Sequence, residues 1–186
     1  SANGIKYYIN DLGAKKNVLT SVFYTESIEE KIGVKVAMMY NDSYTDTYKL
    51  FTNSIPNTGG THLTGFRTAL TQTVNEYARD KKLLKEKDSN ITGEELKEGL
   101  MLVLSFIMPD PVFSGQTKEI LSSSEARTAV QRLVSKELKV WFETNPKDIK
   151  AIIHSEEFKE HPELFTSQTL ARAKIEDIKA IIHSEE

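Results

Sequence analysis

The sequence predicts an α+β fold, a four-stranded mixed sheet with helices on one face. Segments rich in β-branched and aromatic residues, or with the alternation typical of strands, come first, at 19–25, 33–40 and 48–54. The period then becomes helical from Leu63 to Tyr77, and an almost entirely apolar run follows at 100–108. Such a run is typical of a central strand buried on both faces. Strands followed by amphipathic helices are the pattern of a two-layer sandwich.

The N-terminal third is expected to contain one helix and three strands. A short amphipathic helix spans Gly4 to Leu12 and ends at Gly13, because glycine readily adopts the left-handed conformation at a helix C-terminus. The three strands within 19–55 are expected to form one antiparallel unit. The turn residues Asn41-Asp42-Ser43 separate the last two strands, since their short polar side chains bond their own backbone.

Two long helices are expected in the rest of the chain. The first follows Gly59-Gly60, and its apolar stripe is Leu63, Phe66, Leu70, Val74 and Tyr77. Thr92-x-x-Glu95 is a capping box for a short helix, and Ser122-x-x-Glu125 is expected to cap the last long helix. The stripe of that helix is Ala126, Val130, Leu133, Leu138 and Trp141. Asn145-Pro146 then ends or bends it.

Composition restricts the class of protein. The 186 residues suit one domain at 1–153 followed by an atypical helical tail at 154–186. The chain has no cysteine, which excludes disulfides, thiol nucleophiles and cysteine-zinc sites. No apolar run approaches the ~20 residues of a membrane helix, and no signal peptide opens the chain. We therefore expect a cytoplasmic protein. The net charge of −3 argues against a generally nucleic-acid-binding surface.

Ten residues occur twice near the C-terminus. The segment DIKAIIHSEE spans 148–157 and returns at 177–186. A duplication, an engineered segment and a fault in the sequence would each account for it. The repeat predicts two amphipathic helices, which pack on the body or on a second chain.

The loop after the apolar run is the main candidate site. Residues 110–118, DPVFSGQTK, bring together a glycine, an amide, a hydroxyl and an ammonium group. An ammonium group suits a phosphate because it has three donors, a compact charge and no acceptor. On chemistry alone, the alternative is a solvated surface lysine.

Several motifs resemble, in order and spacing, the transducer domain of bacterial type IIA topoisomerases. They are 57–70 (NTGGTHLTGFRTAL), 83–88 (LLKEKD), 92–100 (TGEELKEGL), the 110–118 loop and 123–127 (SSEAR). The resemblance runs from about Gly4 to about Ile153 and is above all to DNA gyrase B, with the ATPase subunit of topoisomerase IV second. It implies the transducer fold named for the second domain of a small-subunit ribosomal protein. That fold contains a left-handed β-α-β crossover, which no pattern in the sequence determines.

The resemblance also implies a function. In the family, this region couples ATP binding and hydrolysis to DNA strand passage, and its Gln-Thr-Lys loop touches the γ-phosphate of ATP in the neighbouring ATPase domain. The matching positions here are Gln116 and Lys118, with Thr117 between them. The implied cofactors of the full-length enzyme are ATP and Mg²⁺. The implied partners are the ATPase domain of the same polypeptide, DNA, a gyrase A-type subunit and a second copy of the full-length polypeptide.

Other polar residues allow more than one interpretation. Arg67 either faces the hole that holds DNA in the family's dimer or is an ordinary solvated arginine. His62 has no carboxylate partner nearby in the sequence, and the resemblance implies a structural role for it. His154 and His183 stand beside glutamate pairs but lack the spacing of a metal site.

The motifs that would make this chain an enzyme by itself are missing from it. The resemblance assigns the general base, the magnesium-holding asparagine and the glycine-rich lid to the ATPase domain, and no residue here is assigned a catalytic role. We therefore expect one region of a larger enzyme, inactive alone. A DNA-contacting structural module is a second hypothesis, which a steep salt dependence of DNA binding would favour. A transducer from mismatch repair or chaperones is a third, against which the GGTH and LLKEK motifs argue. Gyrase and topoisomerase IV are not distinguished.

Overall fold

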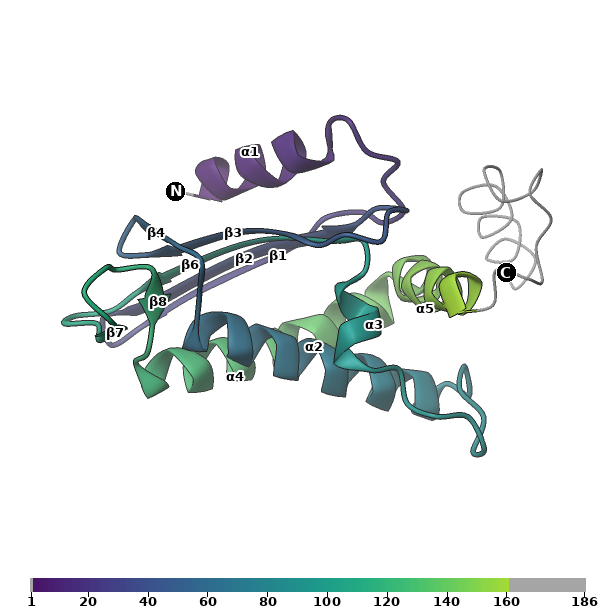
Figure 1. Cartoon of the computed structure of the whole chain (residues 1–186). Helices are drawn as coiled ribbons and strands as arrows, with labels where there is room; N and C mark the ends of the chain where they lie inside the picture. Colours follow the sequence, from purple (N-terminus) through teal and green to yellow (C-terminus); the bar gives the residue numbers. More distant parts are fainter. Residues whose placement is uncertain (1, 161–186) are drawn as a thin grey trace.

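The computed structural model describes residues 2–160, with side-chain detail for residues 4–153 (Figure 1). Two sheets and five helices make up this part of the chain. The elements in chain order are α1 (Ala2–Gly13), β1 (Phe23–Glu29), β2 (Ile32–Tyr40), β3 (Thr47–Thr52), β4 (Ile55–Asn57), β5 (Gly59–Gly60), α2 (Thr61–Asp80), α3 (Gly93–Lys97), β6 (Leu100–Ile107), β7 (Phe113–Ser114), β8 (Ile120–Leu121), α4 (Ser124–Thr144) and α5 (Pro146–Glu160).

The main sheet has five strands in the order β1-β2-β6-β3-β4, so the prediction of four strands is wrong. The additional strand is β4, which continues directly from β3. Asn53 and Ser54 between them both have positive φ, 49° and 68°, which is the backbone of a two-residue hairpin turn. A second small sheet, β5-β8-β7, lies beside the main sheet.

The predicted antiparallel unit of the first three strands is correct for β1 and β2, which pair antiparallel, but wrong for β3. β6 lies between β2 and β3, antiparallel to β2 and parallel to β3. The reason is the sequence of β6, which is apolar at every position except Ser105, since such a strand is most stable at the centre of a sheet. The parallel pair requires a crossover from β3 through α2 and α3 to β6. The left hand of this crossover stays a prediction.

Helices cover both faces of the main sheet, not one face as predicted. α2, α4 and α5 lie on one side, and α1 lies alone on the other (Figure 1). The sheet is apolar on both faces because β2 and β6 are apolar at consecutive positions. Ala37 and Met101 belong to a buried cluster with Ile5 and Ile9 of α1, whereas the alternate residues face the main core, and these include Val36, Met38, Leu102 and Leu104.

The main core lies between the sheet and the pair α2 and α4. The predicted stripe of α2 is buried, except that Tyr77 is half-buried. In α4 the predicted stripe is buried except at Leu133, and Val134 is buried beside it. The two helices approach closely at Gly65, where a Cβ atom would lie 2.4 Å from the carbonyl oxygen of Arg127. Only glycine fits at this crossing without moving a helix.

One of the two predicted capping boxes is confirmed. Thr92 accepts from the backbone of Glu95, whose side chain reaches back to the backbone of Thr92. The other prediction is wrong, because the N-cap of α4 is Ser123 and its side chain makes no cap hydrogen bond. The Ser123 hydroxyl accepts instead from the backbone N–H of Val112 at 2.8 Å, so it holds the chain before β7.

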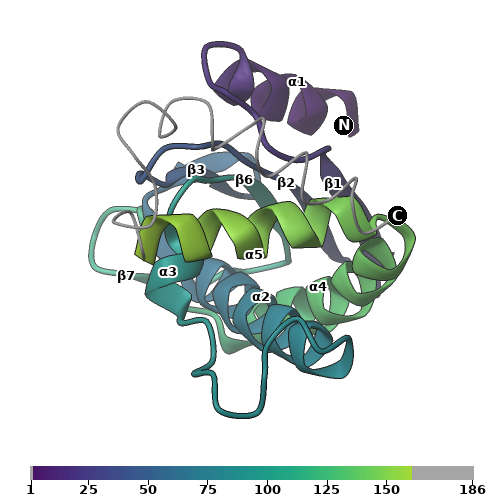
Figure 2. The ribbon, with the colours of Figure 1, turned by 90° about the vertical axis from the view of Figure 1, so that its right-hand side faces the viewer.

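The first copy of the repeat is part of the fold. It lies in α5, which crosses the end of the molecule between the main sheet and the α2–α4 pair (Figure 2). Ile149, Ile152 and Ile153 are buried in the main core, as the amphipathic pattern predicts. Asp148 accepts hydrogen bonds from the backbone N–H and hydroxyl of Ser21, at 2.9 and 2.5 Å. The second copy lies outside the described residues, and the division at residues 153 and 154 stays a prediction.

A chain that ends after Ile153 is expected to melt within a few degrees of the full chain. It keeps every α5 side chain that the structure describes as buried, Ile149, Ala151, Ile152 and Ile153. A chain that ends after Thr144 is the control and should be strongly destabilised, because removing a buried isoleucine side chain costs about 2–5 kcal/mol. Thermal unfolding followed by circular dichroism gives both results. Failure of the first truncated chain to fold would place the following residues in the core.

Candidate functional site

The predicted site residues lie at the tip of the β7–β8 hairpin. This hairpin stands at the end of the molecule opposite α5 (Figure 1). Gln116, Thr117 and Lys118 are all exposed. Gly115, which opens the turn, has a φ of 78°, in the region that favours glycine. The structure therefore presents an amide and an ammonium group to the outside on a short turn.

The Gly-Gly pair forms the strand that supports this hairpin. Gly59 pairs with Ile120 and Gly60 with Leu121, in parallel. Gly60 has a φ of 147°, and a Cβ atom there would lie 2.7 Å from the carbonyl oxygen of Leu121. A side chain at this position would therefore separate β5 from β8. The sequence predicts Gly60 only as a flexible start for the helix. In the structure, close packing against Leu121 requires glycine at this position.

Asn57 connects the hairpin to the body of the protein. Its Nδ2 group donates to the carbonyl oxygen of Lys118 at 2.8 Å. Its Oδ1 atom accepts from the Thr52 hydroxyl at 2.6 Å and lies 3.1 Å from Nε2 of His62. Beside it, the backbone N–H of Thr58 donates to the carbonyl oxygen of Glu119 at 2.8 Å. One side chain thus joins the loop backbone, β3 and α2.

His62 is fully buried in the first turn of α2. Burial lowers its pKa to about 4, and the Gly60 backbone opposes only part of that shift. The ring is therefore neutral at pH 7. Because the amide of Asn57 already donates to Lys118, its oxygen must accept, so the proton of His62 is on Nε2. The other ring nitrogen, Nδ1, is buried without a hydrogen-bond partner of good geometry within residues 4–153.

A further hydrogen bond ties the start of α2 to the start of α4. The hydroxyl of Thr61 donates to the carbonyl oxygen of Ser123 at 2.6 Å. The Thr-His part of the GGTH motif therefore contacts both the hairpin, through Asn57, and the residue before α4. The motif and Asn57 thus join the start of α2 to residues about 60 positions later, in the hairpin and before α4.

Arg67, the predicted nucleic-acid contact, is half-buried and engaged with β3. Its guanidinium donates to the Tyr48 hydroxyl at 3.1 Å and lies over the Tyr48 ring at 5.2 Å from the centroid. Its Nε atom is buried without a hydrogen-bond partner in the part of the chain that the structure describes. Burial raises the pKa of Tyr48 to about 12, and a hydrogen bond with Asp46 adds to the shift. Arg67 is therefore not a fully solvated arginine.

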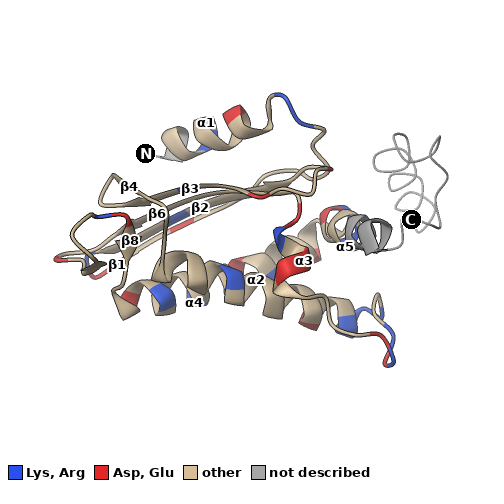
Figure 3. Ribbon diagram, in the orientation of Figure 1, with Lys and Arg blue, Asp and Glu red and all other residues tan. Residues whose placement is uncertain are grey.

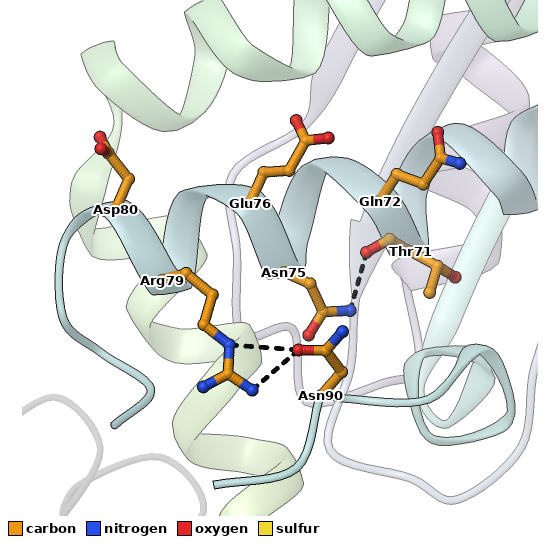
Figure 4. Close-up of a pocket in the computed structure, with 7 residues that line it drawn as sticks. All are labelled: Thr71, Gln72, Asn75, Glu76, Arg79, Asp80 and Asn90. Atoms are coloured by element: carbon orange, nitrogen blue, oxygen red, sulfur yellow. Dashed lines mark hydrogen bonds between the residues drawn. The ribbon is translucent and has the colours of Figure 1, made fainter. Parts of the chain in front are cut away.

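A hollow lies between α2 and the loop at 81–91, and its polar side chains hold that loop in place. It is lined by Thr71, Gln72, Asn75, Glu76, Arg79, Asp80 and Asn90 (Figure 4). Arg79 donates to Oδ1 of Asn90 at 2.8 and 3.1 Å and to the carbonyl oxygens of Lys85 and Asp88. Asn75 holds Ile91 through two hydrogen bonds of 2.8 Å. These contacts fix the 81–91 loop onto α2, a role that the lysine- and acid-rich sequence of the loop does not indicate.

Charged residues are spread along the ribbon of the described part of the molecule (Figure 3). Among residues 4–153, no group of three or more histidine, cysteine, aspartate or glutamate side chains could hold a metal ion. The side chains of His154 and His183 lie outside the described residues. No helix of the described part is long and apolar enough to cross a membrane.

The residue that the sequence analysis missed is Asn57. It begins the 57–70 motif, but its role depends on Lys118, which is 61 residues away. No periodicity links residues so far apart, because periodic patterns report only the local element.

The sequence comparisons agree with the fold and the motifs. The sequence profile described as DNA gyrase B matches residues 4–169. The DNA gyrase B protein of Caulobacter vibrioides is 43% identical over 152 residues, which is 81% of this chain and 19% of the relative. The DNA gyrase B protein of Mycobacterium leprae is 48% identical over 122 residues, which is 65% of this chain and 18% of the relative. The chain therefore spans about a fifth of the length of these curated relatives.

Comparison with solved structures also finds gyrase B and topoisomerase IV domains. The 43K ATPase domain of Thermus thermophilus gyrase B, in complex with an aminocoumarin, superposes with a TM-score of 0.76 at 29% identity, over 88% of this chain and 46% of that one. The topoisomerase IV ATP-binding domain of Francisella tularensis has a TM-score of 0.67 at 24% identity, over 82% and 41% of the two chains, and shows the shared fold alone. The chain belongs to the DNA gyrase B family of type IIA topoisomerases, and it corresponds to the transducer region.

Proposed function

We propose that this region couples ATP binding and hydrolysis to DNA strand passage, through contacts of Gln116 and Lys118 with the γ-phosphate of ATP. The observation that carries the proposal is the β7–β8 hairpin, which exposes both side chains at its tip while Asn57 holds its backbone. A loop with a fixed base and polar groups turned outward suits contact with a ligand that a neighbouring domain binds.

The chemistry of the two side chains supports this assignment. The Lys118 ammonium donates charge-assisted hydrogen bonds to phosphate oxygens, and the Gln116 amide donates a neutral one. Hydrolysis and phosphate release remove the acceptors for both groups. The loop then loses its contacts with the nucleotide domain, which is the order–disorder logic of other nucleotide switches.

The rest of the proposed enzyme lies outside this chain. The Thermus thermophilus chain that it resembles is an ATPase domain, of which it matches less than half. We propose that the remaining part of such a polypeptide binds ATP and Mg²⁺ and that this region acts beside it in the same chain. DNA, a gyrase A-type subunit and a second copy of the full-length polypeptide are the further proposed partners, and a topoisomerase IV complex is the alternative assembly.

Lysine labelling in a full-length polypeptide that carries this region tests the proposal directly. A non-hydrolysable ATP analogue with Mg²⁺ should reduce acetylation of Lys118 several-fold, because a phosphate-bound ammonium group is a poor nucleophile, whereas ADP should not. Lys16, an exposed lysine in the α1–β1 connection, serves as the matched control. Equal labelling of Lys118 in all nucleotide states would refute the contact.

The 186-residue chain alone is expected to hydrolyse no ATP. The groups that we propose for nucleotide contact are two exposed side chains, which supply neither a magnesium site nor a general base. Phosphate release is measured with the chain at micromolar concentration through successive purification steps. Turnover that stays with the chain at constant specific activity would contradict the prediction.

DNA contact by Arg67 is a separate proposal. Part of its guanidinium already binds Tyr48, which leaves fewer donors for a phosphate. Binding of the isolated chain to duplex DNA over a salt series tests it. A steep slope that decreases by about one for Arg67→Ala would support a phosphate contact, and no binding at low salt would exclude the DNA-contacting module.

A further inference from the structure

We infer that Asn57 and His62 are positioning residues, which hold the backbone of Lys118 so that its ammonium group meets the γ-phosphate. The inference rests on the proposed contact between Lys118 and ATP. It adds two residues that touch no nucleotide and whose role is visible only in the hydrogen bonds at the base of the loop.

The loop needs such an anchor because its own strands are very short. β7 and β8 contribute two residue pairs, Phe113 with Leu121 and Ser114 with Ile120. Lys118 lies outside these pairs. A hairpin of this size is at best marginally stable by itself, and lysine has a long side chain with high rotamer entropy. A fixed backbone therefore removes a large part of the disorder that opposes a defined contact.

Asn57 supplies the anchor with both ends of one amide. Nδ2 donates to the Lys118 carbonyl oxygen at 2.8 Å, and Oδ1 accepts from Thr52 at 2.6 Å. Rotating the amide by half a turn would set its oxygen against the Lys118 carbonyl oxygen, so that two acceptors would face each other. The amide thus has one stable orientation, and aspartate, which cannot donate, is unable to replace it.

His62 holds Asn57 in that orientation. Its Nε2 atom lies 3.1 Å from Oδ1 of Asn57, and its ring is fully buried in the first turn of α2. A buried ring cannot move without disturbing the core, so the hydrogen bond starts from a rigid position. The pair therefore links the exposed loop to a 20-residue helix through two side chains.

Two kinds of variant separate positioning from general stability. Asn57→Ala and His62→Leu remove the anchor, whereas His62→Gln keeps an amide N–H near the position of Nε2. Asn53→Ala is the matched control, because Asn53 makes a similar pair of hydrogen bonds with the backbone of Met108, at 2.9 and 3.0 Å. Asn53 lies four residues before Asn57 and bonds to the end of β6, not to the loop. Asn57→Ser replaces Asn57→Ala if the latter does not fold.

The first measurement is ¹⁵N relaxation of the Lys118 amide in the isolated chain. Asn57→Ala should lower its order parameter below about 0.6, the range of flexible backbone, and Asn53→Ala should leave it unchanged.

The second measurement is ATP turnover of the full-length polypeptide. Asn57→Ala and His62→Leu should lower kcat about tenfold with a smaller change in KM, because misplacing a catalytic contact mainly affects the transition state. His62→Gln and Asn53→Ala should stay within about threefold of the parent.

The outcomes distinguish this inference from the proposed function. An unchanged order parameter in Asn57→Ala would overturn the inference, as would a looser loop with full turnover. Either result leaves the proposed function standing if Lys118→Ala is impaired. Full turnover in the Lys118→Ala variant would overturn both the proposed function and the role of Asn57 in it.

Discussion

Lys118→Ala is expected to lower ATP turnover of the full-length polypeptide by about 10²–10³-fold, the usual cost of removing one group that stabilises transition-state charge. The expectation follows from the exposed ammonium group at the tip of the β7–β8 hairpin and from the backbone contacts that hold it there. Lys118→Arg should recover only part of the activity, because a planar guanidinium does not present its donors as a compact ammonium does. DNA strand passage should decrease in parallel.

The control for this experiment is Lys16→Ala, which removes an exposed lysine far from the hairpin in sequence. Steady-state kinetics gives kcat and KM for ATP, and thermal unfolding shows that each variant is folded. Lys118 has an exposed side chain, so its removal should change stability by less than about 0.5 kcal/mol. Parent-level turnover in a folded Lys118→Ala variant would show that the loop makes no essential contact with the nucleotide.

The second large effect is a loss of stability between pH 6.5 and pH 4 that depends on His62. Its pKa is about 4 in the folded chain and 6.5 in the unfolded chain. As the pH falls, the unfolded chain therefore binds a proton before the folded chain does, and unfolding becomes more favourable. The slope approaches 1.4 kcal/mol per pH unit, so the loss attributable to His62 reaches about 3 kcal/mol near pH 4.

Denaturant unfolding at pH 7, 6, 5 and 4.5 measures this effect, with His62→Gln as the reference. Carboxylates also titrate at the acid end of the range, but they do so in both proteins. The difference between the two free energies of unfolding should therefore shift in favour of His62→Gln as the pH falls. Parallel curves for the two proteins would mean that His62 is not held neutral by burial.

The features that the sequence predicts correctly are those that depend on neighbours within a few residues. The stripe of α2, the capping box at Thr92 and Glu95, and the break at Asn145-Pro146 all agree with the structure. Each results from local geometry: side chains three or four residues apart share one face of a helix, a cap bonds to the backbone three residues away, and proline restricts the residue before it. The burial of β6 is also predicted correctly, because a nearly unbroken apolar run leaves neither face of the strand suited to solvent.

The errors concern features that require distant parts of the chain. The first strand begins at Phe23, not at residue 19, because before Phe23 the backbone N–H of Tyr40 donates to the Thr20 hydroxyl and not to a backbone partner. Ser122-x-x-Glu125 has the pattern of a capping box, yet the Ser123 hydroxyl bonds to Val112 across the chain. A serine hydroxyl can bond to several nearby backbone groups or to a distant one. Tertiary packing decides which of these hydrogen bonds forms.

The sequence by itself determined the helices and the four longest strands (β1, β2, β3 and β6), the family resemblance, and the loop with Gln116 and Lys118. Only the tertiary structure decided that β6 lies between β2 and β3, that α1 covers the second face, and that Asn57 holds Lys118. The physical reason is the range of the interactions. Periodicity reflects contacts between residues three or four apart, whereas strand order and the Asn57 contact depend on side chains that meet only after the chain has closed a loop of tens of residues.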